Sequence, residues 1–376
     1  MAGVSQSSES VREGLEGVVV TATRLSHVDG EQGRLIVAGH DIEQLAERLD
    51  FEQACELLWA TSGLESAGAA LRPRLAAARA EAFERLHGLG DALARENAMD
   101  ALRAAAAHLA ENASPAQLVG ALAVFSAAHW RVRRGLAPIA SPPGARHSEA
   151  LLAMLGLPHD AARSRALDAY FVTVLDHGLN ASTFAARVVA STHSDLVSAL
   201  VAGIGALKGP LHGGAPGPVL EMLEAIGRPE RARQYLDAEL ASGRRIMGMG
   251  HRIYRQRDPR ALVLERAASE LERALAASDG EQSERDARLR GRLELARAVE
   301  RAAEQVLAAR HPERPLKANV EFYTAVLLSA LDIDASLFSA IFACARCAGW
   351  AAHYVEQRHH GRLIRPASHY IGALPG

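Results

Sequence analysis

The apolar residues of this chain repeat almost everywhere at a spacing of three to four positions, the period of an amphipathic α-helix. The pattern begins with Ile42, Leu45 and Leu49 and is still present at Leu295 and Val299. Alanine, the strongest helix former, is abundant throughout and lets helices approach one another closely. A chain with this pattern buries its apolar stripes by packing helix against helix, so we predict an all-α fold.

The strand signal is confined to the N-terminal region. Residues 18–20 (VVV) and 35–37 (LIV) are short, β-branched stretches, and Asp29, Gly30 and Gly33 lie between them. Turn residues between two such stretches favour a hairpin or a small meander. We therefore expect one short β-hairpin ahead of the helices.

Helix starts are marked by capping boxes, in which the N-cap side chain and a side chain three positions later exchange hydrogen bonds with the backbone. Asp50 with Gln53 fits this pattern, and so does Ser114 with Gln117, which also has a proline at the first helical position. Both pairs precede apolar stripes, so each predicts a helix N-terminus.

Three stretches interrupt the helical pattern. Residues 134–147 carry three prolines and two glycines, which predicts a loop. Residues 277–292 have almost no apolar side chains, and we expect an exposed, mobile connection there. Residues 1–13 are polar and are expected to form a disordered tail, without the apolar segment of a signal peptide.

Charge and cysteine content exclude several classes of protein. The 376 residues include 42 basic and 44 acidic side chains, a net charge of −2, which argues against binding to nucleic acid. No apolar run reaches the ~18 residues that a membrane span requires. The three cysteines, Cys55, Cys344 and Cys347, cannot form a disulfide framework. A reducing compartment fits this usage, so we expect a cytoplasmic protein.

His212 lies in a glycine-rich stretch, residues 209–217, just before a predicted helix. The N–H groups and the dipole at a helix start favour negative charge and disfavour an imidazolium ion. A neutral histidine at such a place can donate a hydrogen bond to a developing enolate. The alternative is a surface histidine in an ordinary loop, but the flanking glycines permit a ligand to approach closely and favour a site.

A carboxylate opens another predicted helix. Asn319 can serve as its N-cap, which places Glu321 in the first turn, where a negative charge is stabilised in any case. That role is structural, but the same dipole would keep Glu321 ionised, as a base for proton abstraction must be.

Arginines are concentrated in two segments. Arg346 lies among the apolar residues 342–353, where a buried charge is costly unless a structural or a substrate carboxylate meets it. Residues 248–260 hold four arginines, which either bind phosphates or carboxylates or form a solvated basic turn. Cys344 and Cys347 have helix-core spacing and no second cysteine pair, so we interpret them as small core residues rather than metal ligands.

Taken together, these segments resemble the citrate synthase family over nearly the whole chain and in the family's order. The motifs that carry the likeness are GRLIVAGHDIEQLA, HGLNASTFAARVVAST, GALKGPLHGGA, GHRIYRQRDPRA, NVEFY, FACARCAGWAAHYVEQ and RLIRP. The resemblance implies an all-helical homodimer whose large and small domains close over oxaloacetate and acetyl-CoA. It places the large domain at residues 14–214 and 328–376 and the small domain at residues 215–327.

The resemblance also implies which residues act in catalysis. His212 would stabilise the enol of acetyl-CoA, and His251 would hold and polarise the oxaloacetate carbonyl. Glu321 would remove the methyl proton, although the family has an aspartate at this position. Abstraction of a proton next to a thioester needs a base opposite an enolate stabiliser, which agrees with these roles.

The remaining site residues follow from the same resemblance. Those implied to bind oxaloacetate are His177, Arg260, Arg346 and Arg365, the last reaching in from the partner subunit. Those matched to the phosphates of CoA are Lys208 and Arg255.

We expect an acyltransferase of the tricarboxylic acid cycle that condenses an acyl-CoA, acetyl-CoA in the first instance, with oxaloacetate and releases citrate and CoA. One methyl group in a pocket is worth only about 1–3 kcal/mol, so a 2-methylcitrate synthase that uses propionyl-CoA remains an alternative. A non-catalytic relative that binds an acyl-CoA or a tricarboxylate is another. No metal or prosthetic group is implied, since the acyl-CoA is a substrate.

Overall fold

The computed structural model describes residues 12–15, 17–64, 70–212, 216–251, 253–277, 284–313 and 316–373, with the backbone alone for residues 284–290. Most of the expected N-terminal tail lies outside these residues, as does the first part of the expected connection, residues 278–283.

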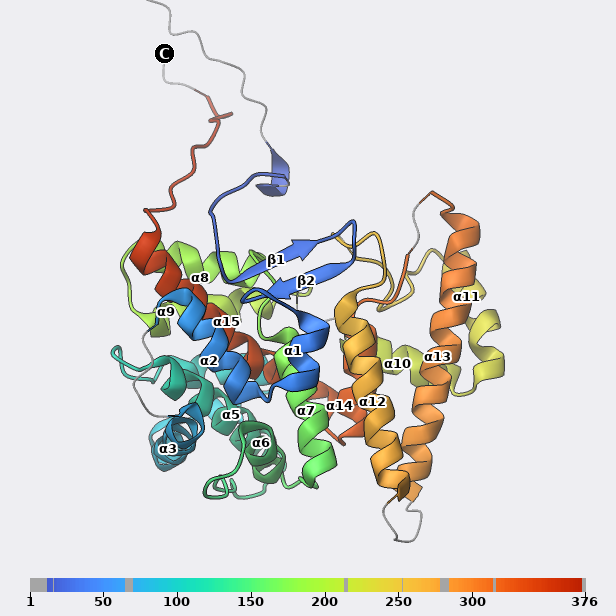
Figure 1. The fold of residues 1–376 in the computed structure, drawn as a ribbon, viewed down its shortest axis with the longest axis horizontal. Helices are drawn as coiled ribbons and strands as arrows, with labels where there is room; N and C mark the ends of the chain where they lie inside the picture. Colours follow the sequence, from blue (N-terminus) through green and yellow to red (C-terminus); the bar gives the residue numbers. More distant parts are fainter. Residues whose placement is uncertain are drawn as a thin grey trace, which may run out of the picture.

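The described chain is almost entirely helical, as the apolar periodicity predicts (Figure 1). The first nine α-helices are α1 (Ile42–Arg48), α2 (Phe51–Ser62), α3 (Leu71–Glu84), α4 (Ala98–Ala106), α5 (Pro115–Val132), α6 (His147–Leu155), α7 (Ala161–Val174), α8 (Ala181–Ser191) and α9 (Leu196–Leu207). They are followed by α10 (Pro216–Ile226), α11 (Ala232–Ala241), α12 (Pro259–Ala277), α13 (Glu284–Arg310), α14 (Val320–Ala330) and α15 (Phe338–His360). Short 3₁₀ turns occupy Glu13–Leu15, Arg85–Gly88, Ala92–Ala94, Pro229–Arg231 and Ala335–Leu337.

The sheet is a small antiparallel meander of β1 (Ser26–Asp29), β2 (Arg34–Val37) and β3 (His40–Asp41), in the order β1-β2-β3. The predicted turn lies where expected, but residues 18–20 are not a strand. Val19 is 89% exposed and these residues pair with no strand in the described structure, so their β-branched side chains gain nothing from an extended ladder. The strand that pairs with β2 is instead the polar segment SHVD.

Both predicted capping boxes are confirmed. Asp50 and Gln53 exchange side-chain and backbone hydrogen bonds at the start of α2, and Ser114 and Gln117 do so at the start of α5. The predicted loop after α5 is also present and ends where α6 begins.

The expected mobile connection at residues 277–292 is wrong in its second part, because α13 begins at Glu284. Its charged residues are good helix formers, and the helix is fixed further along by the buried residues Leu293, Ala296 and Val299.

The helix α15 runs through the centre of the larger group of helices and packs against α2, α5, α8 and α9 (Figure 1). The segment Ala335–His360 is long and apolar enough to span a membrane by composition, but 78% of its most apolar window is buried inside the protein, as in a core helix. The ring of Trp350 lies so close to α9 that a Cβ at Gly203 would come within 2.9 Å of it. Cys344 and Cys347 are both buried in this helix, as predicted.

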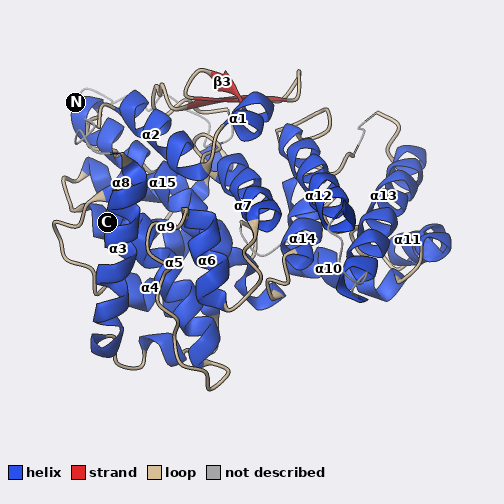
Figure 2. Cartoon of the chain, turned by 60° about the horizontal axis from the view of Figure 1, so that its bottom comes forward, coloured by secondary structure: helices blue, strands red, loops and turns tan. Residues whose placement is uncertain are grey.

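The helices α10 to α13 lie together at one side of the molecule, where α12 packs against both α7 and α14 (Figures 1 and 2). The sheet lies at one edge, next to α1 (Figure 2). The division into two domains stays a prediction: one expected boundary, after residue 214, falls outside the described residues, and the other, after residue 327, falls within α14.

Candidate active site

Two histidines that lie far apart in the sequence come together in the structure. His177 follows α7 and is buried, and its ring centroid lies 5.7 Å from that of His251, which precedes α12. The hydroxyl of Tyr254 lies 3.1 Å from Nε2 of His177, and its ring centroid lies 4.7 Å from that of His251. Tyr254 therefore packs against both histidines.

The hydrogen bonds of His251 determine which of its ring nitrogens carries the proton. Nδ1 accepts the backbone N–H groups of Ile253 at 3.1 Å and Tyr254 at 3.2 Å, so the proton of the neutral ring is assigned to Nε2. Burial and the positive charge of Arg260 lower the pKa of His251 to about 4. At neutral pH this histidine is an uncharged donor. Its Nε2 lies 3.4 Å from Nη2 of Arg260, and because the guanidinium can only donate, this contact is not a hydrogen bond when Nε2 carries the proton.

Arg260 is held rigidly at the start of α12. Its Nε and Nη2 donate to the two carboxylate oxygens of Asp258 at 3.0 and 2.8 Å, the bidentate geometry that fixes a guanidinium plane. Asp258 also accepts the backbone N–H of Val320 at 3.2 Å, which ties the start of α14 to the same pair. Burial alone would lower the pKa of Arg260, but Asp258 holds it above its ordinary value.

Arg346 differs from Arg260 because no carboxylate in the described residues pairs with it. The residue is only 1% exposed, its Nε donates to the carbonyl of Val174 at 2.7 Å, and its Nη2 is buried without a hydrogen-bond partner in the described structure. The guanidinium carbon lies 4.6 Å from the ring centroid of Phe342. Burial lowers the pKa of Arg346 to about 10. No described carboxylate lies within ion-pair distance of Arg346, although the charges of Asp176 and Glu321 act to raise its pKa. Whether its partner is a structural or a substrate carboxylate stays a prediction.

Glu321 lies in the first turn of α14, as predicted, and its backbone N–H donates to the N-cap side chain of Asn319 at 3.0 Å. The amide of Asn319 in turn donates to the carbonyl of Gly250 at 2.9 Å, which joins this helix start to the His251 segment. Burial raises the pKa of Glu321 to about 7, although Arg260 and Arg346 act in the opposite direction. At neutral pH Glu321 is therefore only partly ionised, less than the helix start alone would give, because desolvation raises its pKa.

His212 is held by the start of α8. The backbone N–H of Ser182 donates to its Nε2 at 3.3 Å, and the Ser182 hydroxyl lies 2.9 Å from the same atom. The proton of the neutral ring is therefore assigned to Nδ1. Burial and the charge of Arg346 lower the pKa of His212 to about 4, so it is neutral, as the sequence predicts. The charge of Arg346 also lowers the pKa of Glu321, so the base candidate and the donor candidate both lie within the range of that charge.

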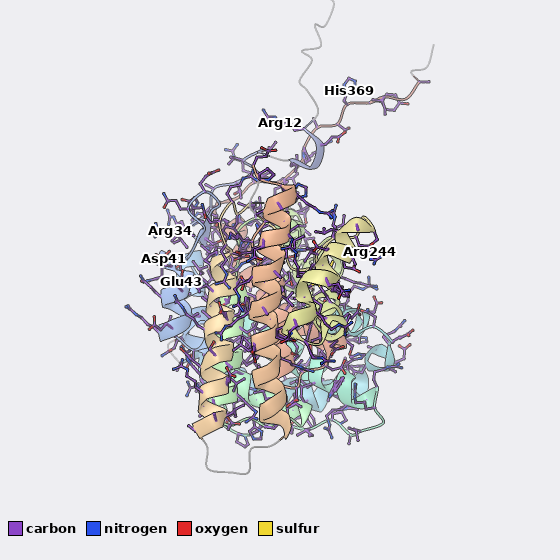
Figure 3. All side chains as sticks on the ribbon, turned by 90° about the vertical axis from the view of Figure 1, so that its right-hand side faces the viewer. Arg12, Arg34, Asp41, Glu43, Arg244 and His369 are labelled. Atoms are coloured by element: carbon purple, nitrogen blue, oxygen red, sulfur yellow. The ribbon has the colours of Figure 1, made fainter. Side chains whose placement is uncertain are left out.

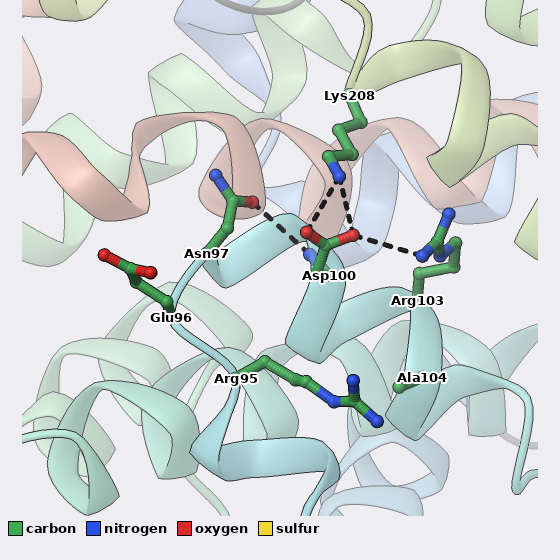
Figure 4. Close-up of a pocket in the computed structure, with 7 residues that line it drawn as sticks. All are labelled: Arg95, Glu96, Asn97, Asp100, Arg103, Ala104 and Lys208. Atoms are coloured by element: carbon green, nitrogen blue, oxygen red, sulfur yellow. Dashed lines mark hydrogen bonds and ion pairs between the residues drawn. The ribbon is translucent and has the colours of Figure 1, made fainter.

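Three of the residues predicted for the site do not lie with the histidines, the two buried arginines and Glu321 in the structure of a single chain. The ammonium of Lys208 is turned onto both oxygens of Asp100 at 2.7 Å, beside a cavity of about 660 Å³, and Arg103 holds the same carboxylate at 3.1 Å (Figure 4). Arg255 is exposed. Arg365 is also exposed, on a C-terminal segment that projects away from the helices towards His369 (Figures 1 and 3).

The sequence reasoning missed Ser182, Tyr254 and the bidentate role of Asp258. Ser182 follows two residues after the N-cap Asn180, and Tyr254 lies three residues after His251, but only the folded chain shows which side chains they meet. No group of three potential metal ligands is assembled among the residues that the structure describes.

A comparison with known families gives one match over most of the chain. The family described as "Citrate synthase, C-terminal domain" matches residues 14–367. The chain belongs to the citrate synthase family.

Curated relatives and solved structures agree with this assignment. The chain is 35% identical to "Putative citrate synthase 2" of Mycobacterium tuberculosis H37Rv, over 98% of this chain and 94% of the relative. It is 36% identical to "2-methylcitrate synthase" of the same strain, over 97% of this chain and 93% of that relative. The crystal structure of citrate synthase from Thermotoga maritima MSB8 superimposes with a TM-score of 0.81 at 30% identity, covering 98% of this chain and 97% of that one. The all-α citrate synthase fold predicted from the sequence is confirmed.

Proposed function

We propose that this citrate synthase family member condenses acetyl-CoA with oxaloacetate and hydrolyses the resulting thioester to citrate and free CoA. The single observation that carries the proposal is Arg346, a buried guanidinium with a free N–H group, whose charge acts on two neutral histidines and on a carboxyl group of raised pKa. Perturbed groups gathered around one charged residue are typical of an active site.

Oxaloacetate is a small diacid with a ketone, and the site has groups for each part. Arg260 and Arg346 bind its carboxylates, the first held in orientation by Asp258 and the second through its free Nη2. His251 donates its Nε2 proton to the ketone oxygen, and His177 lies beside it. A neutral donor suits this role, because it stabilises the alkoxide that forms at that oxygen without itself needing a counter-ion.

The first chemical step is the removal of a methyl proton from acetyl-CoA. The carboxylate of Glu321 takes the proton, and the electron pair of the broken C–H bond moves onto the thioester oxygen as an enolate. The Nδ1 proton of His212, fixed by the bonds of Ser182 to Nε2, stabilises that oxygen. A base with a pKa of about 7 is well matched to this transfer at neutral pH.

The enolate carbon then forms a bond to the ketone carbon of oxaloacetate, and the electron pair of the C=O π bond moves onto the ketone oxygen. The resulting alkoxide accepts the hydrogen bond from Nε2 of His251 and takes up the proton that Glu321 removed, which regenerates the Glu321 carboxylate. Water adds to the thioester, the C–S bond breaks, and CoA leaves as the thiol. The methylene that distinguishes Glu321 from the family's aspartate moves the base, and catalysis is sensitive to a displacement of about 1 Å.

For the CoA part of the substrate we propose a cavity of about 650 Å³ that is lined by His251, Arg244 and Arg245. Arg244 lies at the surface next to α11 (Figure 3). Unlike the expected pair Lys208 and Arg255, these arginines line the same cavity as His251, and guanidinium groups suit phosphates.

We also propose that the enzyme is a homodimer of a reducing, cytoplasmic compartment. The exposed C-terminal segment that bears Arg365 has Leu363 at 59% and Ile371 at 91% exposure, and a second copy of the chain would cover these side chains. Arg365 would then complete the site of the partner. All three cysteines are buried free thiols, in keeping with a reducing environment.

A thiol-release assay with purified protein tests the proposal. Oxaloacetate plus acetyl-CoA should release CoA. The same assay with propionyl-CoA tests the second candidate function, 2-methylcitrate synthesis. That candidate stays open because the chain is nearly equally identical to a putative citrate synthase and to a 2-methylcitrate synthase. Faster release from propionyl-CoA would favour that second activity. A folded protein that binds oxaloacetate and releases CoA from neither donor would favour the non-catalytic alternative and contradict the proposal.

A further inference from the structure

The N-terminal hairpin touches both segments that carry the oxaloacetate-binding histidines. On one side, the hydroxyl of Ser26 in β1 donates to Asp176 at 2.5 Å and accepts the backbone N–H of Gly178 at 2.9 Å. These two partners are the neighbours of His177 in the chain, so the base of β1 holds His177 from both sides.

The tip of the same hairpin meets the segment that follows His251. The carbonyl of Gly30 accepts the backbone N–H of Arg255 at 2.9 Å. The approach is close: a Cβ at position 30 would overlap the carbonyl oxygen of Ile253 and lie 2.9 Å from its carbonyl carbon. A Cβ at Gly33 would lie 2.9 Å from the side chain of Gln256.

The hairpin is itself anchored to the helix that carries Arg346. The backbone N–H of Arg24 donates to Glu356 at 2.8 Å, and His353 donates from Nε2 to Asp176 at 3.0 Å, both from α15. Since Arg187 donates to Nδ1 of His353, that nitrogen is the acceptor and the ring proton is assigned to Nε2. The base of the hairpin is therefore fixed, and its tip can act as a stop for the His251 segment.

We infer that the hairpin of β1 and β2 is a positioning element that sets the separation of His177 and His251, and with it the affinity for oxaloacetate. The inference rests on the proposed function. The hairpin holds none of the residues proposed to bind oxaloacetate, and it acts through Tyr254 and Ile253, whose N–H groups bind Nδ1 of His251. A shift of the Ile253 backbone moves those donors and the ring that they hold.

Gly30→Ala is the direct perturbation. The backbone at Gly30 is not in the left-handed region, so alanine is conformationally acceptable and the clash with Ile253 is the main effect. Gly88→Ala is the matched control, because a Cβ there meets nothing within 4 Å in the described part of the chain and the backbone is also ordinary. Ser26→Ala tests the other end of the hairpin by removing the hydroxyl that binds Asp176 and Gly178.

We expect Gly30→Ala to raise KM for oxaloacetate about tenfold or more, since a misplacement of about 1 Å can cost up to ~10²-fold. KM for acetyl-CoA should change less than twofold, and hydrogen exchange at the Arg255 amide should become faster. Ser26→Ala should raise the same KM by a smaller factor, and Gly88→Ala should leave it unchanged.

Oxaloacetate binding measured by calorimetry separates this inference from the proposed function. If wild-type protein releases no CoA but binds oxaloacetate more tightly than Gly30→Ala does, the proposed activity fails and the positioning role stands. If Gly30→Ala binds oxaloacetate as wild type does, the positioning role is wrong. Should Gly30→Ala fail to fold, wild-type oxaloacetate affinity in Ser26→Ala would overturn the inference in its place.

Discussion

Arg346 and Arg187 are two buried arginines with opposite surroundings, and replacing each by methionine should change stability in opposite directions. Both are about 1% exposed. Arg187 donates to His353, Gln357 and the carboxylate of Glu356. Arg346 has only one backbone carbonyl as a hydrogen-bond partner among the described residues.

The expected size of the Arg346 effect follows from its pKa. Burial lowers that pKa from 12.5 to about 10, which corresponds to about 3 kcal/mol by which the ligand-free fold disfavours the charge. The folded pKa is depressed, so this cost is present at every pH below about 10. Loss of the hydrogen bond to Val174 offsets about 1–2 kcal/mol. Arg346→Met should therefore raise the free energy of unfolding by about 1–2 kcal/mol, whereas Arg187→Met should lower it by about 3–5 kcal/mol because it strands Glu356.

Urea unfolding at pH 7, with and without oxaloacetate, measures both effects. Oxaloacetate should stabilise wild type and should not stabilise Arg346→Met, whose affinity we expect to fall by about 3 kcal/mol, ~150-fold. An Arg346→Met protein that is strongly destabilised and binds oxaloacetate normally would show that Arg346 has a structural partner, and would refute the reasoning.

Three further predictions follow from the site. The kcat/KM for acetyl-CoA should rise with pH through about 7 as Glu321 ionises. The histidines should add no further change in kcat/KM above pH 5, because the pKa values of His212 and His251 are about 4. A flat profile of kcat/KM from pH 6 to 8 would contradict this. Because the folded pKa of Glu321 is raised, its contribution to stability falls as pH rises from about 4.5 to 7, so Glu321→Gln should be more stable at pH 8 by up to about 3 kcal/mol in urea unfolding. Ser182→Ala should lower kcat about tenfold or more with KM for oxaloacetate nearly unchanged, as steady-state kinetics would show.

Local signals in the sequence predict the helices and their starts well. The capping boxes at Asp50 and Ser114 and the N-cap at Asn319 depend on residues within one turn of each other, so the sequence contains all the partners that they need. The all-α class follows from a periodicity that extends along the whole chain.

Features that depend on distant residues could not be predicted in the same way. The segment SHVD has no apolar alternation and becomes β1 because it pairs with β2 and because Ser26 meets Asp176. Burial and the charge of Asp258 raise the pKa of Glu321, whereas Arg260 and Arg346 lower it, and the fold brings these three residues to Glu321 from two other segments. The sequence motifs predict which residues form the site. Only the fold shows that Nη2 of Arg346 is buried without a hydrogen-bond partner among the described residues.

Solvent exchange of the acetyl-CoA methyl protons tests the central claim most directly, because it isolates proton removal from condensation. The protein is placed in D₂O with acetyl-CoA and malate, a dicarboxylate that fills the oxaloacetate position but has no ketone to attack, and the methyl signal is followed by NMR. Wild type should incorporate deuterium, and Glu321→Gln should reduce the rate at least ~10²-fold. Exchange at the wild-type rate in Glu321→Gln would show that another group is the base, and would contradict the account.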